Sequence, residues 1–278
     1  MSPQPFDQLP RSVRDHARHT VLGATGVPAL LAHPQDWSSP APFCLWMHGR
    51  SVNKELDPGR YSRWLRAGIG VVAIDLPGHG ERADPPRHGP ETTVEVIAEV
   101  LPEIDQVLDA LRGPGLAGSF DLERAAIGGM SMGGMIALRR LCDPHEFRCA
   151  SVEGTTGDLC GLYFPQAGDD HEGWPVRHER AAVDPVDANT HLDGFEPIPL
   201  LVLHSEADEM VPWTVQERFV DRVREHFSAR GVSPDTVEVH TWAETGAPAE
   251  HVGFGRFSNE AKNLQTAFFA RHLLGDSE

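Results

Sequence analysis

The chain has 278 residues, of which 40% are hydrophobic and 23% charged, a balance that excludes disorder of the whole chain. It carries 24 lysines and arginines against 41 aspartates and glutamates, so its net charge is 24 − 41 = −17. A surface this acidic repels phosphate backbones and anionic lipids, and it counts against nucleic-acid and membrane-surface partners.

The sequence indicates a protein without membrane segments or metal-binding cysteine motifs. No run approaches the ~18 apolar residues of a transmembrane helix. The first residues lack a basic end followed by an apolar core, so we expect no signal peptide and a cytoplasmic location. The cysteines have no CxxC or finger spacing, and we expect buried free thiols: they are Cys44, Cys142, Cys149 and Cys160.

Short apolar runs alternate with longer amphipathic ones, which is typical of a mostly parallel sheet flanked by helices. Strands are predicted at residues 20–22, 27–32, 43–47, 71–75, 125–130, 150–152, 200–204 and 237–242. Helices are predicted at residues 92–111, 131–141, 212–229 and 260–274, where apolar side chains recur at helical spacing or follow a helix start signal. We therefore expect one α/β domain over residues 1–278.

Residues 154–196 depart from this alternation. They are rich in Asp, Gly, Pro and His and show little periodicity. Long segments without clear elements often form lids or binding loops, so we predict a small cap inserted between two strands. Four of its side chains are candidates for the apolar lining of a substrate pocket, although core packing explains them equally well: Leu162, Tyr163, Phe164 and Trp174.

Residues 129–133 read Gly-Met-Ser-Met-Gly and match the G-x-S-x-G pattern of a nucleophile elbow. The pattern is weak alone, but an apolar strand leads into it and a helix-forming run leads out of it. A sharp strand-to-helix turn strains the serine backbone and requires small neighbours at Gly129 and Gly133. The turn lifts the Ser131 hydroxyl to a helix N-terminus, where negative charge is favoured. Ser131 is therefore the predicted nucleophile.

A serine hydroxyl needs a base, and the base needs an acid that orients it. Asp208 follows a buried strand, at the sheet edge where such sites lie, with Glu206 and Glu209 as rivals. Of the 15 histidines, His251 lies in a loop after the last strand and can reach over this edge. His226, His240 and His272 lie in predicted helices or strands and are weaker candidates.

The negative charge that develops in acyl transfer needs two backbone N–H groups directed at it. Met132 follows the nucleophile and is one candidate, and Arg50, after the strand at residues 43–47, is the other. The Arg50 side chain is then free to form a surface salt bridge, which we expect, or to meet a substrate carboxylate. We expect His48 and His79 to hold loops by hydrogen bonds rather than to take part in chemistry.

These motifs together resemble the α/β-hydrolase superfamily over most of the chain, and more closely the bacterial prolyl-oligopeptidase-like and dienelactone-hydrolase-like carboxylesterases. The resemblance rests on His-Gly at 48–49, Asn-Lys-Glu at 53–55, the Asp-Leu-Pro-Gly-His-Gly-Glu-Arg turn at 75–82, the elbow, and Asp208 with Val-Pro at 211–212. It implies that Ser131, His251 and Asp208 form a triad that hydrolyses carboxylic esters through an acyl-enzyme, without a cofactor.

The chain also departs from parts of that superfamily. Dienelactone hydrolases proper use cysteine as the nucleophile and haloalkane dehalogenases use aspartate, whereas this chain has Ser131. The oligopeptidases carry a propeller domain, for which this chain has no room. The expected substrate is a small ester with a short acyl chain, and the sequence does not indicate an oligomeric state.

Several alternatives stay open at this point. An acyl-peptide peptidase, an amidase or a thioesterase would use the same three residues, because the triad is shared among these reactions. A ligand-binding protein that keeps the fold but not turnover is a further alternative. Acids and histidines at residues 169–172 and at His178 cluster in the predicted cap, but their spacing fits no defined metal-ligand pattern, so we expect no metal.

Overall fold

The computed structural model describes residues 6, 8–166, 169, 171 and 173–275. Its strands are β1 (Ala17–Leu22), β2 (Val27–Ala32), β3 (Ala41–Met47), β4 (Gly70–Ile74), β5 (Phe120–Met130), β6 (Cys149–Glu153), β7 (Leu200–Ser205) and β8 (Val237–Trp242). Its α-helices are α1 (Arg11–Arg14), α2 (Pro58–Arg66), α3 (Thr93–Arg112), α4 (Met132–Arg140), α5 (Leu159–Tyr163), α6 (Arg180–Val183), α7 (Trp213–Ala229) and α8 (Ser258–Leu273). Short 3-10 helices are η1 (Gly80–Arg82), η2 (Pro85–His88), η3 (Pro90–Thr92), η4 (Asp184–Val186), η5 (Ala188–Gly194), η6 (Pro234–Thr236), η7 (Pro248–Glu250) and η8 (Gly255–Phe257).

All eight strands form one sheet, in the order β1-β2-β4-β3-β5-β6-β7-β8. Neighbours from β4 onward pair in parallel, whereas β2 is antiparallel to both β1 and β4. The chain runs outward from β3 to β4 and returns to form β5 on the other side of β3. The loops after β3 and β5 therefore diverge, and in open α/β sheets such a divergence at the carboxyl ends of the strands makes a binding crevice.

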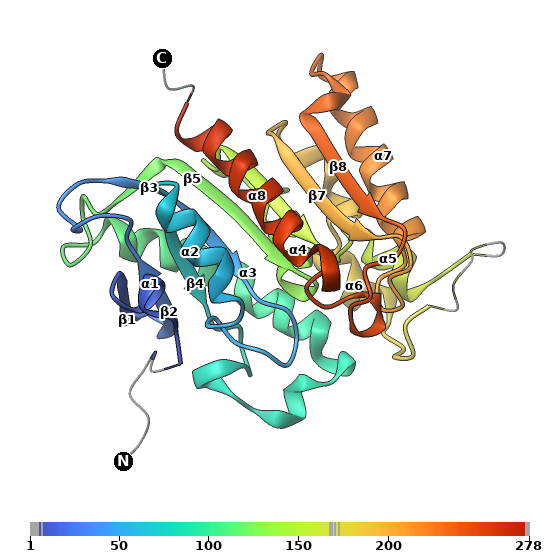
Figure 1. Cartoon of the computed structure of the whole chain (residues 1–278). Coiled ribbons are helices and arrows are strands. Elements are labelled where there is room, and N and C mark those ends of the chain that lie inside the picture. The colour runs from blue at the N-terminus through green and yellow to red at the C-terminus, as the bar shows by residue number, and fades with distance from the viewer. Residues whose placement is uncertain (1–5, 7, 167–168, 170, 172, 276–278) are drawn as a thin grey trace.

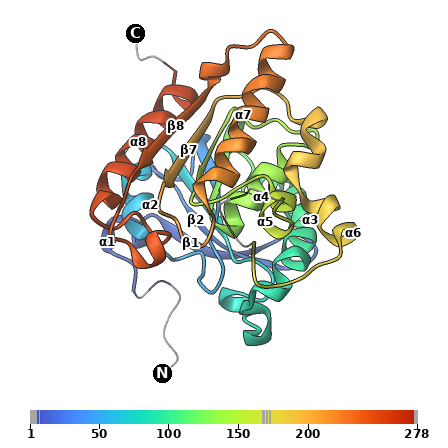
Figure 2. The ribbon, with the colours of Figure 1, turned by 90° about the vertical axis from the view of Figure 1, so that its right-hand side faces the viewer.

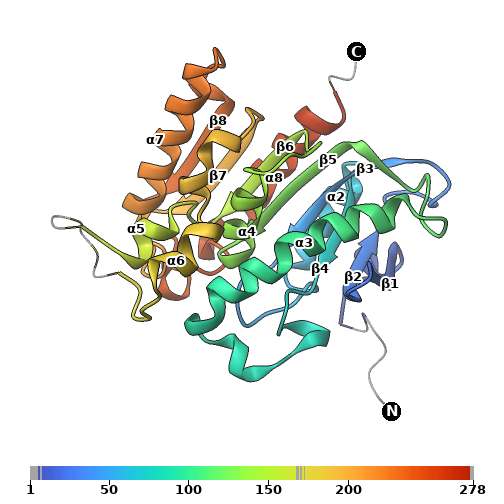
Figure 3. The same cartoon turned by 180° about the vertical axis from the view of Figure 1, so that it is seen from behind.

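Helices cover both faces of the sheet. Figure 1 shows α2 and α8 in front of it, and the view from behind in Figure 3 shows α3 and α4 on the opposite face. In the edge view of Figure 2, α8 lies on one side of the sheet and α7 on the other. This layered arrangement is the predicted α/β class, and it leaves the ends of the strands as the accessible edges of the sheet.

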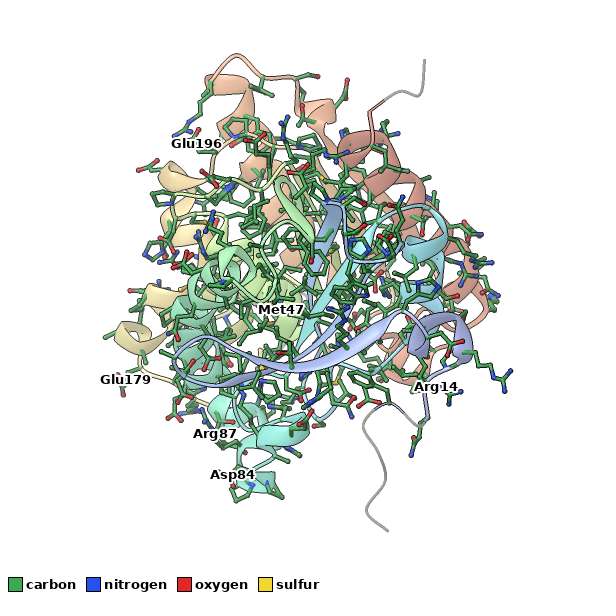
Figure 4. All side chains as sticks on the ribbon, turned by 90° about the vertical axis from the view of Figure 1, so that its left-hand side faces the viewer. Arg14, Met47, Asp84, Arg87, Glu179 and Glu196 are labelled. Atoms are coloured by element: carbon green, nitrogen blue, oxygen red, sulfur yellow. The ribbon has the colours of Figure 1, made fainter. Side chains whose placement is uncertain are left out.

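The two faces bury separate apolar clusters, because side chains alternate along each strand. In β3, Phe43, Leu45 and Met47 join the cluster beneath α3, α4 and α7, whereas Cys44 and Trp46 join the cluster beneath α2 and α8. Figure 4 shows Met47 near the middle of the packed side chains, with the other labelled residues, all charged, at the periphery. The four cysteines are buried and unpaired, which confirms the expectation of free thiols.

The predicted strands and long helices are confirmed. Ends differ by at most two residues for α3, α4, α7 and α8, and the largest strand difference is the five-residue extension at the start of β5. That extension carries the charged residues Asp121, Glu123 and Arg124 and pairs with β3 only through an irregular register, so it does not show an apolar pattern. No helix in the described parts of the chain is both long and apolar enough to cross a bilayer.

Two parts of the chain differ from the prediction. Helix α2 was not predicted, because its buried face carries Arg60 beside Tyr61 and Trp64, and a buried arginine interrupts the apolar period. The segment between β6 and β7 does contain elements, α5, α6, η4 and η5, so the expectation of a segment without them is wrong. These helices have seven residues or fewer, too few to show a period, and in Figure 3 α5 and α6 lie beside α4.

Arg60 of α2 is buried and forms an ion pair with Glu153 at the end of β6. Its Nη1 and Nη2 donate to the two carboxylate oxygens of Glu153, at 2.5 and 2.8 Å, and Gln265 accepts a further hydrogen bond. The guanidinium carbon also lies 4.3 Å from the ring centre of Trp46. This pair joins α2 to the end of β6, and both side chains are nearly inaccessible to solvent.

We predict that Arg60→Ala lowers the free energy of unfolding by about 3–5 kcal/mol, because it leaves the Glu153 carboxylate buried without a cation. The matched control is Arg63→Ala on the same helix, whose partly exposed guanidinium binds Asn259, Asn263 and the Gly59 carbonyl. Its loss leaves no buried charge unpaired and costs about 1 kcal/mol. Urea unfolding curves of the three proteins measure both values. Equal losses in the two variants would contradict the importance of the buried pair.

Candidate active site

Ser131 occupies the turn between β5 and α4 in a strained conformation. Its φ is 52° and its ψ is −121°, outside the regions that residues with a side chain prefer. Such strain persists only where the surroundings fix it. Here the Ser131 N–H donates to the Glu153 carbonyl at 2.9 Å, and its carbonyl accepts from Thr155 Oγ1 at 2.7 Å. Two neighbours on the β6 side therefore hold the backbone of the turn.

The turn is possible only because its neighbours are glycines. A Cβ at Gly129 would lie 2.3 Å from the carbonyl carbon of Gly133, and a Cβ at Gly133 would lie 2.2 Å from the carbonyl oxygen of Met47. Both distances are far inside van der Waals contact. The close approach also brings α4 against the end of β3, so the loop after β3 lies directly beside Ser131.

A chain of hydrogen bonds leads from Ser131 to a buried carboxylate. The Ser131 hydroxyl lies 2.9 Å from His251 Nε2, and His251 Nδ1 lies 2.7 Å from Asp208 Oδ2. The carboxylate accepts the Nδ1 proton, so Nε2 is left free to accept the proton of the hydroxyl. The structure thus brings together the three predicted residues, although His251 lies 43 positions after Asp208 and 120 positions after Ser131 in the sequence.

Asp208 is oriented by the loop that carries it. Its Oδ1 accepts the N–H groups of Met210 and Val211, both at 2.8 Å, which leaves Oδ2 for His251. The rival acids lie apart from this chain of bonds: Glu206 accepts from the Thr241 hydroxyl, and Glu209 is exposed.

His204 lies behind Asp208 and was not singled out from the sequence. It is fully buried at the end of β7, and its Nε2 donates to the Val211 carbonyl at 2.8 Å, 3.6 Å from Asp208 Oδ2. Burial lowers the pKa of His204, so the ring is neutral and adds no charge beside the carboxylate. A histidine within an otherwise apolar strand is the only signal in the sequence.

The loop before His251 is closed by Glu250. Its carboxylate accepts the N–H groups of Thr245 and Gly246, at 2.5 and 2.6 Å, and the Ser205 hydroxyl at 3.0 Å. These bonds, led by the one from the Thr245 N–H, lower the pKa of Glu250 to about 2. Glu250 therefore stays ionised and fixes the position of the imidazole that follows it. The other histidines considered, on α7, β8 and α8, lie elsewhere.

The loop after β3 is held by His48, as predicted. His48 Nε2 accepts the Leu76 N–H at 3.1 Å, and Nδ1 donates to the Gly49 carbonyl at 2.6 Å. Burial lowers the pKa of His48 to about 4, so the ring is neutral and can act as both acceptor and donor. His79 makes a similar local bond, from Nδ1 to the Pro77 carbonyl. Lys54, further along the loop, binds the buried Asp75 at 2.7 Å.

Two backbone N–H groups beside Ser131 are available to a ligand. An ideal Cβ on Gly49 would lie 3.4 Å from Ser131 Cβ, so the loop that carries Arg50 touches the nucleophile turn. Met132 is the first residue of α4, where N–H groups lack intrahelical partners. Among the residues that the structure describes, neither the Arg50 N–H nor the Met132 N–H donates a hydrogen bond. The two residues predicted to supply backbone N–H groups therefore both border Ser131 in the described structure.

The Arg50 side chain does not form the expected salt bridge. Within the described residues it has no carboxylate within ion-pair distance, and its Nη1 has only the Thr93 hydroxyl at 3.4 Å. The guanidinium is half-buried, and its carbon lies 5.6 Å from the ring centre of Trp174. The expectation of a surface salt bridge is wrong because the loop turns this side chain inward toward Trp174, away from surface acids.

A cavity of about 270 Å³ opens over Ser131 and His251. It is lined by Gly49, Arg50, Ser51, Val52, Leu56, Met130, Ser131, Trp174, Met210, Pro248, Ala249, His251 and Val252. A second cavity, of about 250 Å³, shares a wall with it formed by Gly49, Leu56, Met130 and Val252, and has Arg60 and Glu153 among its lining residues. A volume of this size holds a small ligand rather than a long chain.

Of the predicted apolar lining, Trp174 borders this cavity and donates from Nε1 to the Met210 carbonyl at 2.6 Å. Leu162 and Tyr163 pack into the apolar core, and Phe164 borders a different cavity on the far side of α5. Of the acids and histidines considered as metal ligands and set aside, Asp170 and Glu172 lie outside the described residues. The described part of the chain has no group of three or more His, Cys, Asp or Glu placed to hold a metal ion.

Comparisons with known proteins agree on the fold. The model of the alpha/beta hydrolase family matches residues 32–274. The esterase Pf2001 of Pyrococcus furiosus superimposes with a TM-score of 0.67 and 18% identity, over 98% of this chain and 97% of that one. The acylaminoacyl peptidase of Pyrococcus horikoshii gives a TM-score of 0.72 and 16% identity, over 94% of this chain and 42% of that one.

A curated relative, the protein named Hydrolyase poxO from Penicillium oxalicum, is 32% identical over 128 residues. The match covers 45% of this chain and 29% of the relative, so the chain spans less than a third of that protein's length. TT1662 of Thermus thermophilus is a further structural neighbour, with a TM-score of 0.65 and 22% identity over 92% of this chain and 98% of that one.

The low pKa of Glu250 predicts how loop stability depends on pH. Because the folded pKa, about 2, is below the ordinary value of 4.5, Glu250 contributes its full stabilisation above pH 4.5 and loses it as the pH falls toward 2. Glu250→Gln lacks this dependence. The difference in free energy of unfolding between wild type and variant should therefore be largest at pH 5–7 and narrow at pH 4 and pH 3.

Urea unfolding at pH 7, 5, 4 and 3 measures the difference in free energy of unfolding between wild type and Glu250→Gln. Glu209→Gln is the matched control, because its carboxylate is exposed and accepts no hydrogen bond from the loop. A gap between wild type and Glu250→Gln that stays constant from pH 7 to pH 3 would contradict the role assigned to the ionised carboxylate.

Proposed function

The chain belongs to the alpha/beta hydrolase family and is a hydrolase, and on that premise we propose that it cleaves carboxylic esters of short acyl chain through a Ser131–His251–Asp208 triad. The observation that supports the proposal most is the continuous hydrogen-bond chain from the Ser131 hydroxyl through His251 to Asp208. At the Ser131 end of this chain, the strained serine lines a small cavity beside the backbone N–H groups of Arg50 and Met132.

The proposed reaction begins with proton transfer. His251 Nε2 accepts the Ser131 proton as Oγ attacks the ester carbonyl, and the carbonyl π electrons move to the oxygen. The N–H groups of Arg50 and Met132 stabilise that oxyanion, and the helix N-terminus of α4 adds to the favourable field. Asp208 holds the imidazole in the productive tautomer and stabilises the imidazolium that forms.

The tetrahedral intermediate then collapses. The carbonyl re-forms, the bond to the alcohol oxygen breaks, and His251 gives its proton to the leaving alkoxide. A water molecule repeats these steps on the acyl-enzyme: His251 accepts a proton from the water, the hydroxide attacks, and Ser131 leaves with the proton returned by His251. The products are an acid and an alcohol, and no cofactor takes part in the proposed mechanism.

Amide and thioester substrates are the second candidates. The likeness to an acylaminoacyl peptidase keeps short acyl-peptides open, because the same triad serves amides. That peptidase is more than twice as long as the part this chain matches, since only 42% of it is covered. The cavity volume of about 270 Å³ favours a small ester over a peptide.

We predict that Ser131→Ala lowers kcat for a short nitrophenyl ester by about 10⁴-fold or more, because the nucleophile is removed while the binding groups stay. A fluorophosphonate probe should label Ser131 of the wild type stoichiometrically, as mapped by mass spectrometry, and should not label the variant. Circular dichroism controls for folding.

His251→Gln and Asp208→Asn test the roles of His251 as the base and of Asp208 as the acid that orients it. We expect losses of about 10⁴-fold in kcat for each, since the first removes the base and the second leaves the imidazole in the wrong tautomer. Glu206→Gln is the control, because that acid lies outside the chain and should leave kcat within a few-fold of wild type. Turnover by Ser131→Ala at the wild-type rate would overturn the assignment, and label without ester turnover would favour an amide or a non-catalytic role.

A further inference from the structure

Among the described residues, Arg50 forms no ion pair. Five arginines with mostly buried side chains do pair with a carboxylate: Arg60 with Glu153, Arg82 with Glu103, Arg87 with Glu99, Arg139 with Asp143, and Arg140 with Asp105. Arg50 has no such partner in the described part of the chain, and only the Thr93 hydroxyl, at 3.4 Å, accepts from it. Most of its five N–H donors therefore remain available to a ligand.

The surroundings of this guanidinium make the missing anion costly. Arg50 is half-buried, so water solvates the cation only in part, and this burial lowers the pKa of Arg50, although an arginine stays charged in proteins. Glu91 favours the cation at longer range without forming an ion pair, and the ring of Trp174 covers one side. A partly desolvated charge gains more from a counter-ion than an exposed one does.

Apart from Arg50, Ser51, Ser131 and His251, the side chains that line the cavity are apolar. Three of the five large exposed apolar side chains in the described residues line this one cavity: Leu56, Met210 and Val252. Exposed apolar side chains that gather at a cavity mark a place where an apolar ligand binds. Arg50 is the only side chain in the lining that carries a permanent charge, so the wall matches a ligand with an apolar body and one anionic group.

The charge of the whole protein makes a local cation necessary for such a ligand. With a net charge of −17, the long-range field repels anions. A guanidinium at short range overcomes this repulsion, because it can bind a carboxylate through two parallel N–H bonds. The acidic surface is thus compatible with an anionic substrate whose charged group binds Arg50 inside the cavity.

We infer that the ester cleaved at Ser131 carries a free carboxylate on an apolar chain, and that the Arg50 guanidinium binds this carboxylate. The inference rests on the proposed function, and it names the substrate class of the same site. The carboxylate can belong to the acyl part, as in a monoester of a dicarboxylic acid, or to the alcohol part, as in an ester of a hydroxy acid.

Two matched pairs of esters separate these sources. Mono-4-nitrophenyl adipate against 4-nitrophenyl hexanoate places the charge on the acyl part, and 4-carboxyphenyl hexanoate against 4-carbamoylphenyl hexanoate places it on the alcohol part. In the wild type, kcat/KM should be higher for the anionic ester in at least one pair. The ratio of the two values within that pair should fall about 10- to 100-fold in Arg50→Gln.

The ratio of kcat/KM for the anionic ester to that for the neutral ester is the informative quantity, because the backbone of Arg50 also borders the cavity beside Ser131. Any disturbance of its N–H group affects both esters of a pair and cancels in the ratio. Arg50→Lys keeps the charge without the two-pronged geometry and should retain part of the preference. Arg87→Gln is the matched control: it removes a mostly buried arginine that pairs with Glu99 outside the cavity, and the ratio should not change.

The failure of the inference and the failure of the proposed function look different. Hydrolysis of the neutral esters with no preference for the anionic member of either pair, or a preference that survives Arg50→Gln, would overturn the inference alone. If no ester turns over and Ser131 takes no label, the proposed function fails. The inference about a cleaved ester then fails with it, and calorimetric binding of mono-4-nitrophenyl adipate to Ser131→Ala decides whether Arg50 binds the carboxylate. Affinity should fall about 10- to 100-fold when Arg50→Gln is added, and equal affinities would overturn that binding as well.

Discussion

The backbone strain at Ser131 is the constraint on which the rest of the site depends. A serine at φ 52° is stable only where its neighbours leave no alternative, and here they come from the two strands beside β5. Gly133 packs against the Met47 carbonyl at the end of β3, and the Glu153 carbonyl at the end of β6 accepts the Ser131 N–H. The Glu153 side chain in turn holds Arg60 on α2. The nucleophile turn is thus part of the packing that joins the sheet to both helical layers.

The sequence was sufficient for the strands and for the long helices, because each shows a period of apolar residues that needs no knowledge of its partners. It was insufficient where burial and polarity are mixed. Helix α2 buries Arg60 among aromatic rings, which makes sense only once Glu153 is known to lie opposite. Of the four short helices between β6 and β7, α5 and η5 are capped by Asp158 and Asp187, whose carboxylates accept backbone N–H groups. All four helices are too short to display a pattern.

Some residues of the site could likewise be predicted from the sequence, whereas others could not. Ser131, Asp208 and His251 were candidates from their places after strands, because parallel strands bring their carboxyl ends to one edge. His204 and Glu250 were not, since each acts through a contact made across the fold: with the Val211 carbonyl behind Asp208, and with Thr245 and Ser205 at the base of the histidine loop. The direction of the Arg50 side chain depends on Trp174, 124 positions away in the sequence, and spacing does not reveal it.

Met130 stands in the wall between the two cavities beside Ser131. Met130 borders both spaces, stands immediately before the nucleophile, and approaches Gly49 with a flexible thioether. The same wall also contains Gly49, Leu56 and Val252, so a smaller side chain at position 130 would widen the opening between the two cavities and a larger one would narrow it. The space beside Ser131 thus depends in part on a side chain that takes no part in the hydrogen bonds among Ser131, His251 and Asp208.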